Sequence, residues 1–241
     1  MPRDLSVVVP LKDEEASIRV LASEVEQALA AREWDWECVW IDDGSTDGTL
    51  QVLRALRERE PRHEYVSLDA NYGQSAAMAI GFGLARGRII ATLDGDLQSD
   101  PADLPGMIDL LDRGKVDMVN GVRSRRYDSF VRRASSRIAN GFRNWITRET
   151  VRDVGCSVRV CYRECVEDIV VWKGMHRFIP TLVEMRGFKA MEVPVNHRPR
   201  THGKTKYGIH NRLWVGLWDC FAVRWMQARL VHGEVKETSL P

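Results

Sequence analysis

The chain contains the stretch Arg88-Ile89-Ile90-Ala91-Thr92-Leu93-Asp94-Gly95-Asp96-Leu97-Gln98. Its aliphatic run over residues 88–93 predicts a buried strand, which the turn-forming Asp-Gly-Asp sequence ends. Two carboxylates one residue apart at a strand end can reach one divalent cation, and the amide of Gln98 offers a third oxygen. Hard oxygen ligands of this kind suit Mg²⁺ or Mn²⁺, which can in turn bridge a diphosphate.

An Asp-x-Asp sequence has two other interpretations. As the start of an EF-hand loop it fails, because the sixth position is Ser99 instead of glycine and the twelfth is Pro105 instead of glutamate. As a solvated acidic turn without function it stays open on local sequence alone.

Strand and helix patterns alternate on both sides of this stretch. Upstream, we expect strands at residues 5–9, 38–41 and 65–68. We expect helices at residues 14–32 and 75–85, and a further helix that follows a cap at Thr46 or Asp47. Downstream, a helix at 104–111 and a strand at 116–119 follow. This alternation predicts a doubly wound α/β sheet with ligands at the carboxyl ends of its strands. Asp42-Asp43-Gly44-Ser45 ends another strand, where it either binds a ribose or base or only forms a turn.

The second half of the chain is less regular. We expect helices at residues 132–147 and 178–185, strands at 157–162 and 190–195, and a polar loop at 197–208. From Asn211 onward, aromatic and aliphatic residues recur at helical spacing and predict an amphipathic C-terminal helix. Its tryptophans and arginines suit a membrane interface, although Trp214, Trp218 and Trp225 fit a core or an oligomer interface equally well.

The near-neutral total charge conceals a polarised molecule. The 241 residues carry 35 Lys+Arg and 34 Asp+Glu, a net charge of +1. Residues 1–120 hold 12 basic and 23 acidic side chains, whereas residues 121–241 hold 23 basic and 11 acidic ones. The second half is therefore expected to meet an anionic partner. Nucleic acid does not fit, because the acidic half repels it and because residues 125–137 lack an array of stacking aromatic side chains.

Composition sets further bounds. A hydrophobic content of 44% suits an ordinary globular domain and excludes a disordered chain. Five cysteines without zinc-ligand spacing predict free thiols in a reducing cytosol. The N-terminus lacks the apolar region of a signal peptide, and no segment approaches the ~20 apolar residues that span a bilayer. We therefore expect a cytoplasmic chain, which leaves membrane binding open.

Four segments, in order along the chain, resemble family-2 glycosyltransferases of the GT-A fold. They are residues 8–15, Val-Val-Pro-Leu-Lys-Asp-Glu-Glu; 42–49, Asp-Asp-Gly-Ser-Thr-Asp-Gly-Thr; 71–74, Asn-Tyr-Gly-Gln; and 94–101, Asp-Gly-Asp-Leu-Gln-Ser-Asp-Pro. Later segments at 121–123, 153–159 and 200–207, with Arg132 and Ser136, make the chain similar to the polyprenyl-phosphate glycosyltransferases, the group that contains dolichyl-phosphate mannose synthase. The resemblance covers about residues 5–210. It implies a GT-A domain, with a Rossmann-like mixed sheet, over residues 1–210, followed by the amphipathic, membrane-associating helix and tail over 211–241.

The resemblance also implies three neighbouring sites. The nucleotide-sugar donor, with UDP or GDP, would be bordered by Pro10, Lys12, Glu14, Asp42, Asp43 and Gln74, with Arg200 and Lys206 on a loop that closes over it. The Mg²⁺ or Mn²⁺ ion would be held by Asp94, Asp96 and Gln98. The acceptor phosphate would be received by Arg123, Arg132 and Ser136. Asp94, Asp96, Arg123 and Arg132 are thus the candidate catalytic residues.

The implied activity is inverting transfer of a sugar to an undecaprenyl- or dolichyl-type phosphate, by an enzyme held at the cytoplasmic face of the membrane. The charge pattern supports a phosphate acceptor. A phosphomonoester, with a second pKa of ~6, is largely a dianion at neutral pH and needs arginines to guide it. A hydroxyl acceptor instead needs a positioned base.

Two alternatives remain. One is a glycosyltransferase acting on a saccharide or other hydroxyl; against it, Gln51-Val52-Leu53-Arg54 is followed by Ala55, so the QxxRW sequence of polysaccharide synthases is absent. The other is a non-catalytic nucleotide-sugar-binding protein, against which the complete metal-ligand set argues.

Two departures from the family pattern matter. Lys12-Asp13 replaces the usual Tyr-Asn, which leaves the nucleotide base open. Residues 156–159, Cys-Ser-Val-Arg, replace a Gly-Phe-Arg pattern, and Ser157 stands where some relatives have an acidic residue. No protein general base is therefore assigned. Thr205 for the usual serine is a mild change.

Overall fold

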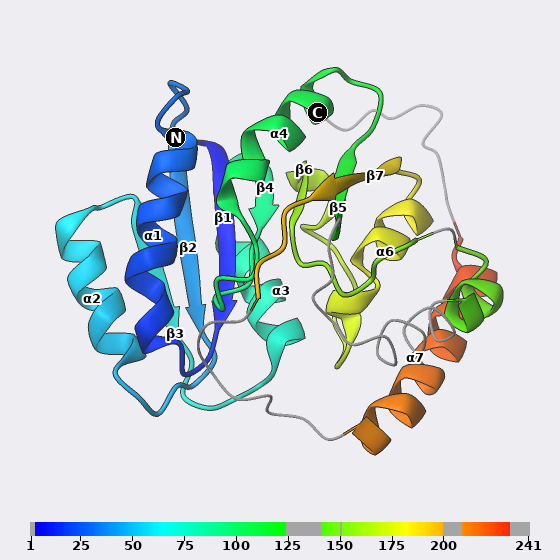
Figure 1. Ribbon diagram of the computed structural model, residues 1–241. Coiled ribbons are helices and arrows are strands. Elements are labelled where there is room, and N and C mark those ends of the chain that lie inside the picture. Colours follow the sequence, from blue (N-terminus) through cyan, green and yellow to red (C-terminus); the bar gives the residue numbers. More distant parts are fainter. Residues whose placement is uncertain (1–2, 124–140, 150, 200–208, 232–241) are drawn as a thin grey trace, which may run out of the picture.

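A computed structural model of the protein describes residues 3–123, 141–149, 151–199 and 209–231, with the backbone alone at 209–215. A seven-stranded sheet in the order β3-β2-β1-β4-β6-β5-β7 forms its centre (Figure 1). The strands are β1 (Arg3–Leu11), β2 (Trp36–Asp42), β3 (His63–Ser67), β4 (Gly87–Thr92), β5 (Met118–Arg123), β6 (Arg159–Tyr162) and β7 (Ala190–Val195). All neighbouring strands are parallel except β6, which runs antiparallel to both β4 and β5. The predicted mixed α/β sheet is confirmed.

Helices cover both faces of this sheet (Figure 1). One face packs against α1 (Glu15–Leu29), α2 (Thr49–Arg59) and α4 (Leu104–Asp112). The other packs against α3 (Gln74–Leu84), α6 (Ile179–Met185), a short helix at residues 141–147, and α7 (Ile209–Arg229). Short 3₁₀ turns lie at Pro101–Asp103, Arg163–Cys165 and Met175–Arg177. The chain is therefore doubly wound, as its alternating pattern predicts.

The hydrophobic run of β1 shows why the sequence forms this layered core. Val7 and Val9 pack in the cluster under α1, whereas Val8 faces the cluster under α3, and all three are fully buried. A strand buried on both faces needs a continuous apolar sequence. Gly81 lets α3 lie directly on β1, since an added Cβ there would sit 2.4 Å from a methyl group of Val8. The Gly-Phe-Gly sequence of α3 is thus a packing feature.

Several predicted boundaries differ from the observed ones, and three of these differences have a clear physical reason. β1 continues through Pro10 to Leu11, because its pairing with β4 ends at Val8–Thr92 and the proline lies beyond that ladder. β5 covers residues 118–123, further along than predicted, because its partner β7 pairs with it as far as Arg123. α2 begins only at Thr49, whose N–H donates to the Asp47 carboxylate.

The C-terminal helix exists, but its side chains are arranged differently from a helix with one buried apolar face. Trp218, Phe221 and Trp225 are 73%, 55% and 64% exposed, so these aromatic residues lie outside the core. Val223 is buried, and so is Asp219, which binds Arg177 over 2.7 Å. The side chain of Trp214 lies outside the described residues.

All five cysteines are free and buried, as expected from their spacing. Within the described ranges, no helix combines the length and apolar character required to cross a membrane.

Candidate active site

Three strand ends bring predicted donor and metal residues to one edge of the sheet. β1 ends at Leu11, β2 at Asp42, and β4 at Thr92, two residues before Asp94. Because β1 lies between β2 and β4 and all three are parallel, their carboxyl ends are neighbours. This is the edge at which open α/β sheets bind ligands.

Asp42 and Asp43 are buried and hold the loops that frame this edge. Asp42 accepts hydrogen bonds from the Ser45 N–H and from a serine hydroxyl on β3, each over 2.9 Å. Asp43 accepts from the N–H groups of Tyr72 and Gly73 over 2.7 and 2.8 Å. The Asp43 contacts fix the loop that leads into α3.

The segment after β1 packs against the same loops. Lys12 donates from its Nζ to the Gly44 carbonyl over 2.7 Å. Glu14 accepts a 3.0 Å hydrogen bond from the Ser17 hydroxyl in the first turn of α1. Pro10, Lys12 and Glu14 therefore line up along the edge from β1 into α1.

The Asp-Gly-Asp turn lies directly against this segment. A Cβ added to Gly95 would lie 3.0 Å from the Leu11 Cβ, so any larger residue there would require Leu11 to shift by a few tenths of an ångström. Asp13 and Leu97 both adopt left-handed backbone angles, with φ of 50° and 63°. Non-glycine residues in that region are uncommon and concentrate at functional sites.

Asp94 and Asp96 are two carboxylates close enough to repel. Burial and the charge of Asp96 raise the pKa of Asp94 to about 6, against a hydrogen bond from Ser157 that lowers it. The Gln74 side-chain amide donates to Asp94 Oδ1 over 2.9 Å. Asp96 is itself buried, and its Oδ1 accepts from the Gln98 N–H over 3.1 Å.

This donor set fits a divalent cation. A positive ion between Asp94 and Asp96 would relieve the repulsion that raises the first carboxylate's pKa. Among the described residues, no three His, Cys, Asp or Glu side chains form a metal-binding cluster. The remaining coordination would come from the Gln98 amide oxygen, substrate oxygens and water, as is usual for Mg²⁺ beside one or two carboxylates.

The polar loop predicted after β7 starts at the metal-site turn. Arg198 donates its N–H to the Gln98 carbonyl over 2.8 Å, and the Gln98 amide reaches the Arg198 carbonyl over 3.4 Å. The Arg198 guanidinium also binds Glu24 and Asp100. Arg200 and Lys206, further along this loop, lie outside the described residues.

On the acceptor side, the structure describes only Arg123, the last residue of β5; Arg132 and Ser136 lie outside the described residues. Arg123 forms a two-pronged ion pair with Asp153, from Nε to Oδ2 over 2.7 Å and from Nη2 to Oδ1 over 2.8 Å. The charge of Arg123 lowers the pKa of Asp94, so the two predicted sites are within electrostatic reach of each other.

Three residues near this site received no role from the sequence. Asp153 forms an ion pair with Arg123, and Ser157 contacts both Asp94 and Thr92. Arg159 is buried, its Nε has no hydrogen-bond partner among the described residues, and its charge lowers the pKa of Asp94. Their segment, 153–159, is part of the family resemblance, and that was the only signal for them.

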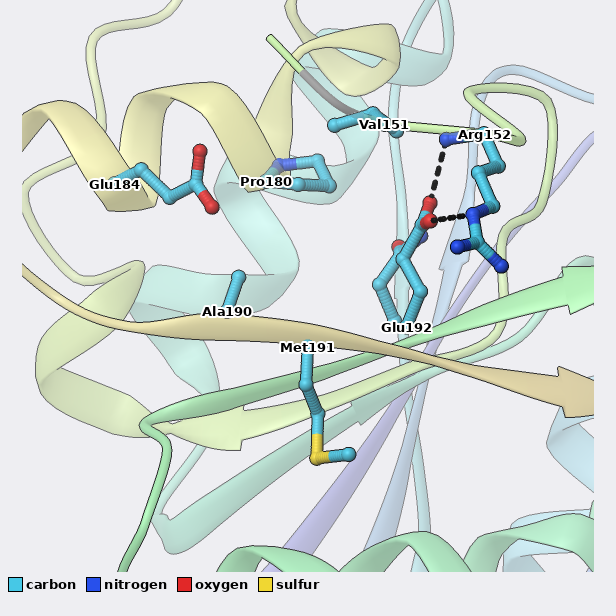
Figure 2. Close-up of a pocket in the computed structure, with 8 residues that line it drawn as sticks. Val151, Arg152, Pro180, Glu184, Ala190, Met191 and Glu192 are labelled. Atoms are coloured by element: carbon cyan, nitrogen blue, oxygen red, sulfur yellow. Dashed lines mark hydrogen bonds and ion pairs between the residues drawn. The ribbon is translucent and has the colours of Figure 1, made fainter.

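One hollow, of about 480 Å³, borders Asp13 and Glu14 at the start of α1. A second, of about 240 Å³, is lined by residues of β5, β7 and α6, among them Asn120, Glu192 and Glu184, and by none of the predicted site residues. Figure 2 shows Glu184 and Glu192 on either side of this second hollow, with Glu192 bound to Arg152.

Comparison with known sequences finds a matching family and several similar proteins. Residues 6–167 match the model of glycosyl transferase family 2. The chain is 40% identical over 210 residues to the dodecaprenyl-phosphate galacturonate synthase of Rhizobium johnstonii, covering 86% of this chain and 62% of that protein. It is 32% identical over 234 residues to the undecaprenyl-phosphate 4-deoxy-4-formamido-L-arabinose transferase of Edwardsiella ictaluri, covering 96% and 72%. The chain thus spans about two thirds of the length of these relatives.

Solved structures share the fold at low sequence identity. A mannosyltransferase from Pyrobaculum calidifontis in complex with GDP-Man and Mn²⁺ superposes with a TM-score of 0.65 at 19% identity, over 95% of this chain and 64% of that one. Glucosyl-3-phosphoglycerate synthase from Mycobacterium tuberculosis, in complex with Mn²⁺ and UDP-glucose, gives 0.67 at 17% identity, over 95% and 80%. These likenesses confirm the expected GT-A architecture.

Proposed function

Because the chain belongs to glycosyl transferase family 2, we propose that it transfers a sugar from a nucleoside-diphosphate sugar to a polyprenyl phosphate, with inversion at the anomeric carbon. One observation carries the proposal: the Asp94–Asp96 turn follows β4 and Arg123 ends β5, and both strands run antiparallel to β6, so the two sites lie at one edge of the sheet. A cation site for a diphosphate therefore adjoins a guanidinium suited to a second phosphate. The named relatives, with lipid phosphates in their names, support the same acceptor class.

On the donor side, Asp94, Asp96 and Gln98 would hold Mg²⁺ or Mn²⁺. When bound, the ion supplies positive charge to the diphosphate leaving group. Gln74 keeps Asp94 in place through its 2.9 Å hydrogen bond. The nucleotide would lie along the edge formed by Pro10, Lys12, Glu14, Asp42 and Asp43, with Arg200 and Lys206 on the loop anchored at Gln98.

On the acceptor side, Arg123, Arg132 and Ser136 would hold the polyprenyl phosphate. A phosphate oxygen forms the new bond to the anomeric carbon, and the bond from that carbon to the donor diphosphate breaks, releasing the nucleoside diphosphate. The attacking oxygen of a phosphate dianion carries no proton, so no base has to remove one. Ser157, where an acidic residue stands in some relatives, agrees with this.

We also assign the two parts of the chain different tasks: residues 1–210 catalyse transfer, and residues 211–241 attach to a membrane. Supporting this, α7 exposes Trp218, Phe221 and Trp225 on one side, at spacings of three and four residues. Phe142 and Trp145 are exposed on the neighbouring helix, whose Thr147 carbonyl accepts a hydrogen bond from Gln227 of α7. Exposed aromatic side chains favour the interface of a bilayer, and the acceptor's polyprenyl chain lies in one. The enzyme would then work peripherally at the cytoplasmic face.

The test is a transfer assay with purified protein, Mn²⁺, undecaprenyl phosphate and a panel of UDP- and GDP-sugars. We expect a glycolipid, extractable into organic solvent, with at least one donor and only in the presence of the metal. Undecaprenol, which lacks the phosphate, is the matched control and should give no product. Absence of glycolipid across the whole panel, or equal transfer to undecaprenol, would overturn the proposal.

A further inference from the structure

Arg123 is held by a buried carboxylate on a different part of the chain. It ends β5, whereas Asp153 lies in the loop before β6, thirty residues later. The side chain of Asp153 is only 2% exposed and that of Arg123 is 22% exposed. Besides the two guanidinium contacts, the Arg123 N–H donates to Asp153 Oδ2 over 3.2 Å. One carboxylate thus fixes both the backbone and the side chain of Arg123.

Gly155 confines the same guanidinium from a second direction. Its N–H donates to Asp153 Oδ1 over 3.3 Å. A Cβ added at Gly155 would lie 2.7 Å from Nη2 of Arg123, but 3.6 Å from Asp153 Oδ1. The guanidinium therefore lies against the bare backbone of this loop, and any larger residue would displace it.

We propose that Asp153 is a positioning residue that orients Arg123 toward the phosphate of the acceptor. This inference rests on the proposed function. Asp153 occupies the Nε/Nη2 edge of the guanidinium. A guanidinium has a second edge at Nη1/Nη2, in the same plane but pointing in a different direction, and such edges bind phosphate oxygens in pairs. Holding the first edge fixes the direction of the second, so less rotational freedom is lost when a phosphate binds.

An effect of Asp153 through its charge alone would change phosphate binding in the opposite direction, so an experiment can distinguish the two explanations. The negative charge of Asp153 cancels that of Arg123 and weakens long-range attraction for an anion. If Asp153 affected the acceptor only through its charge, Asp153→Asn would tighten phosphate binding. If it acts by orienting Arg123, the same substitution weakens binding, because the asparagine NH₂ cannot accept the second guanidinium hydrogen bond.

The experiment compares Asp153→Asn with Gly155→Ala in the full chain. Binding of farnesyl phosphate is measured by calorimetry, and KM for undecaprenyl phosphate by the transfer assay. We expect both variants to weaken farnesyl phosphate binding and raise that KM by about tenfold, with kcat and affinity for the donor nucleotide within about twofold. Asp109→Asn is the matched control, since it removes a carboxylate from the exposed Arg32–Asp109 ion pair, and it should leave both constants unchanged.

A protein that lacks Arg123 distinguishes an effect of Asp153 on the position of that side chain from a general effect on folding. Asp153→Asn should have no further effect on binding in an Arg123→Gln protein, because its action passes through that side chain. Unchanged or tighter binding by Asp153→Asn, an undiminished effect in the Arg123→Gln background, or no farnesyl phosphate binding by the natural protein would each overturn the inference. If the protein binds farnesyl phosphate in an Asp153-dependent way but yields no glycolipid, only the proposed function fails.

Discussion

The side-chain amide of Gln74 donates to Asp94 Oδ1 over 2.9 Å, which joins the first residue of α3 to the carboxylate that follows β4. Asp43 fixes the loop just before α3 through the N–H groups of Tyr72 and Gly73. Asp43, which follows β2, is thereby connected to Asp94, which follows β4, through the residues at the start of α3. The two acidic turns form one connected structure.

Gln74→Ala should reduce transfer by about tenfold and weaken Mn²⁺ binding, because Asp94 loses the partner that holds its Oδ1 in place. Manganese affinity can be followed by electron paramagnetic resonance of the free ion. Gln27→Ala, which removes an exposed glutamine bound to Ser23 on α1, is the control and should change neither value. Equal Mn²⁺ affinity in the Gln74→Ala protein would contradict the positioning role.

Asp96→Ala should abolish metal-dependent transfer while leaving the metal-free protein at least as stable. After burial, the charge of Asp96 is the second cause that raises the pKa of Asp94, so removing Asp96 takes away a repulsion and metal-free folding loses no favourable interaction between the two carboxylates. Thermal unfolding with and without Mn²⁺ and UDP or GDP checks this. The natural protein should gain stability from the ligands and the variant should not. Retained metal-dependent turnover would refute the ligand assignment.

Stability should fall in mild acid because of His63, which is buried against two aromatic rings. Trp40 donates from Nε1 to His63 Nδ1 over 3.1 Å, and His63 Nε2 lies 3.0 Å from Glu26. Burial lowers the pKa of His63 below its usual 6.5, despite the opposing charge of Glu26. As the pH falls, His63 is therefore protonated at a higher pH in the unfolded chain than in the folded protein. The contribution of His63 to stability is complete above pH ~6.5 and is lost as the pH falls through the lower folded value.

Urea unfolding at pH 7.5 and pH 5.5 measures this effect. His63→Gln should show a smaller loss of unfolding free energy between the two pH values than the natural protein does. Gln27→Ala, which removes an exposed, uncharged side chain on α1, serves as the comparison, and its pH dependence should match that of the natural protein. Identical pH dependence in the His63→Gln protein would assign the acid sensitivity to other groups.

Membrane attachment should depend on the exposed aromatic residues of α7. The Trp218→Ala, Trp225→Ala double variant should sediment with vesicles of phosphatidylcholine and phosphatidylglycerol at least tenfold less than the natural protein, since burying one large apolar side chain contributes ~1.5–3 kcal/mol. Val170→Ala with Val171→Ala removes exposed apolar surface elsewhere and is the control. Equal sedimentation of the tryptophan variant would show that another surface binds the membrane.

Local sequence predicted the strands that are buried on both faces, because their aliphatic runs and the turns that end them are encoded within a few residues. β1, β2 and β4 and the acidic turns after them belong to this group. The position of β6 between β4 and β5 was not predictable in this way, because it depends on pairing across more than thirty residues. The boundary error at β5 has the same origin, since β7 extends that strand to Arg123.

The site shows the same division between local and long-range information. Asp94, Asp96 and Gln98 stand within five residues, so local sequence makes them candidate cation ligands, although it does not exclude a solvated acidic turn. The Arg123–Asp153 pair and the buried Arg159 arise from contacts between distant segments, so neither composition nor periodicity indicates them. The roles of Arg132, Ser136, Arg200 and Lys206 stay predictions.

The insertion of antiparallel β6 between β4 and β5 sets a distance. Asp94 follows the end of β4 and Arg123 ends β5, so two inter-strand steps of ~4.8 Å separate their strands. Were β4 and β5 adjacent, only one step would separate the strand ends that carry Asp94 and Arg123; under the proposed function, β6 therefore makes room for the sugar between the two phosphates. Because β6 runs in the opposite direction, its first residues, with Asp153 and Ser157 just before them, arrive at this same edge. The reversed strand β6 thus separates Asp94 from Arg123 and also brings residues 153–159 to the sheet edge between them.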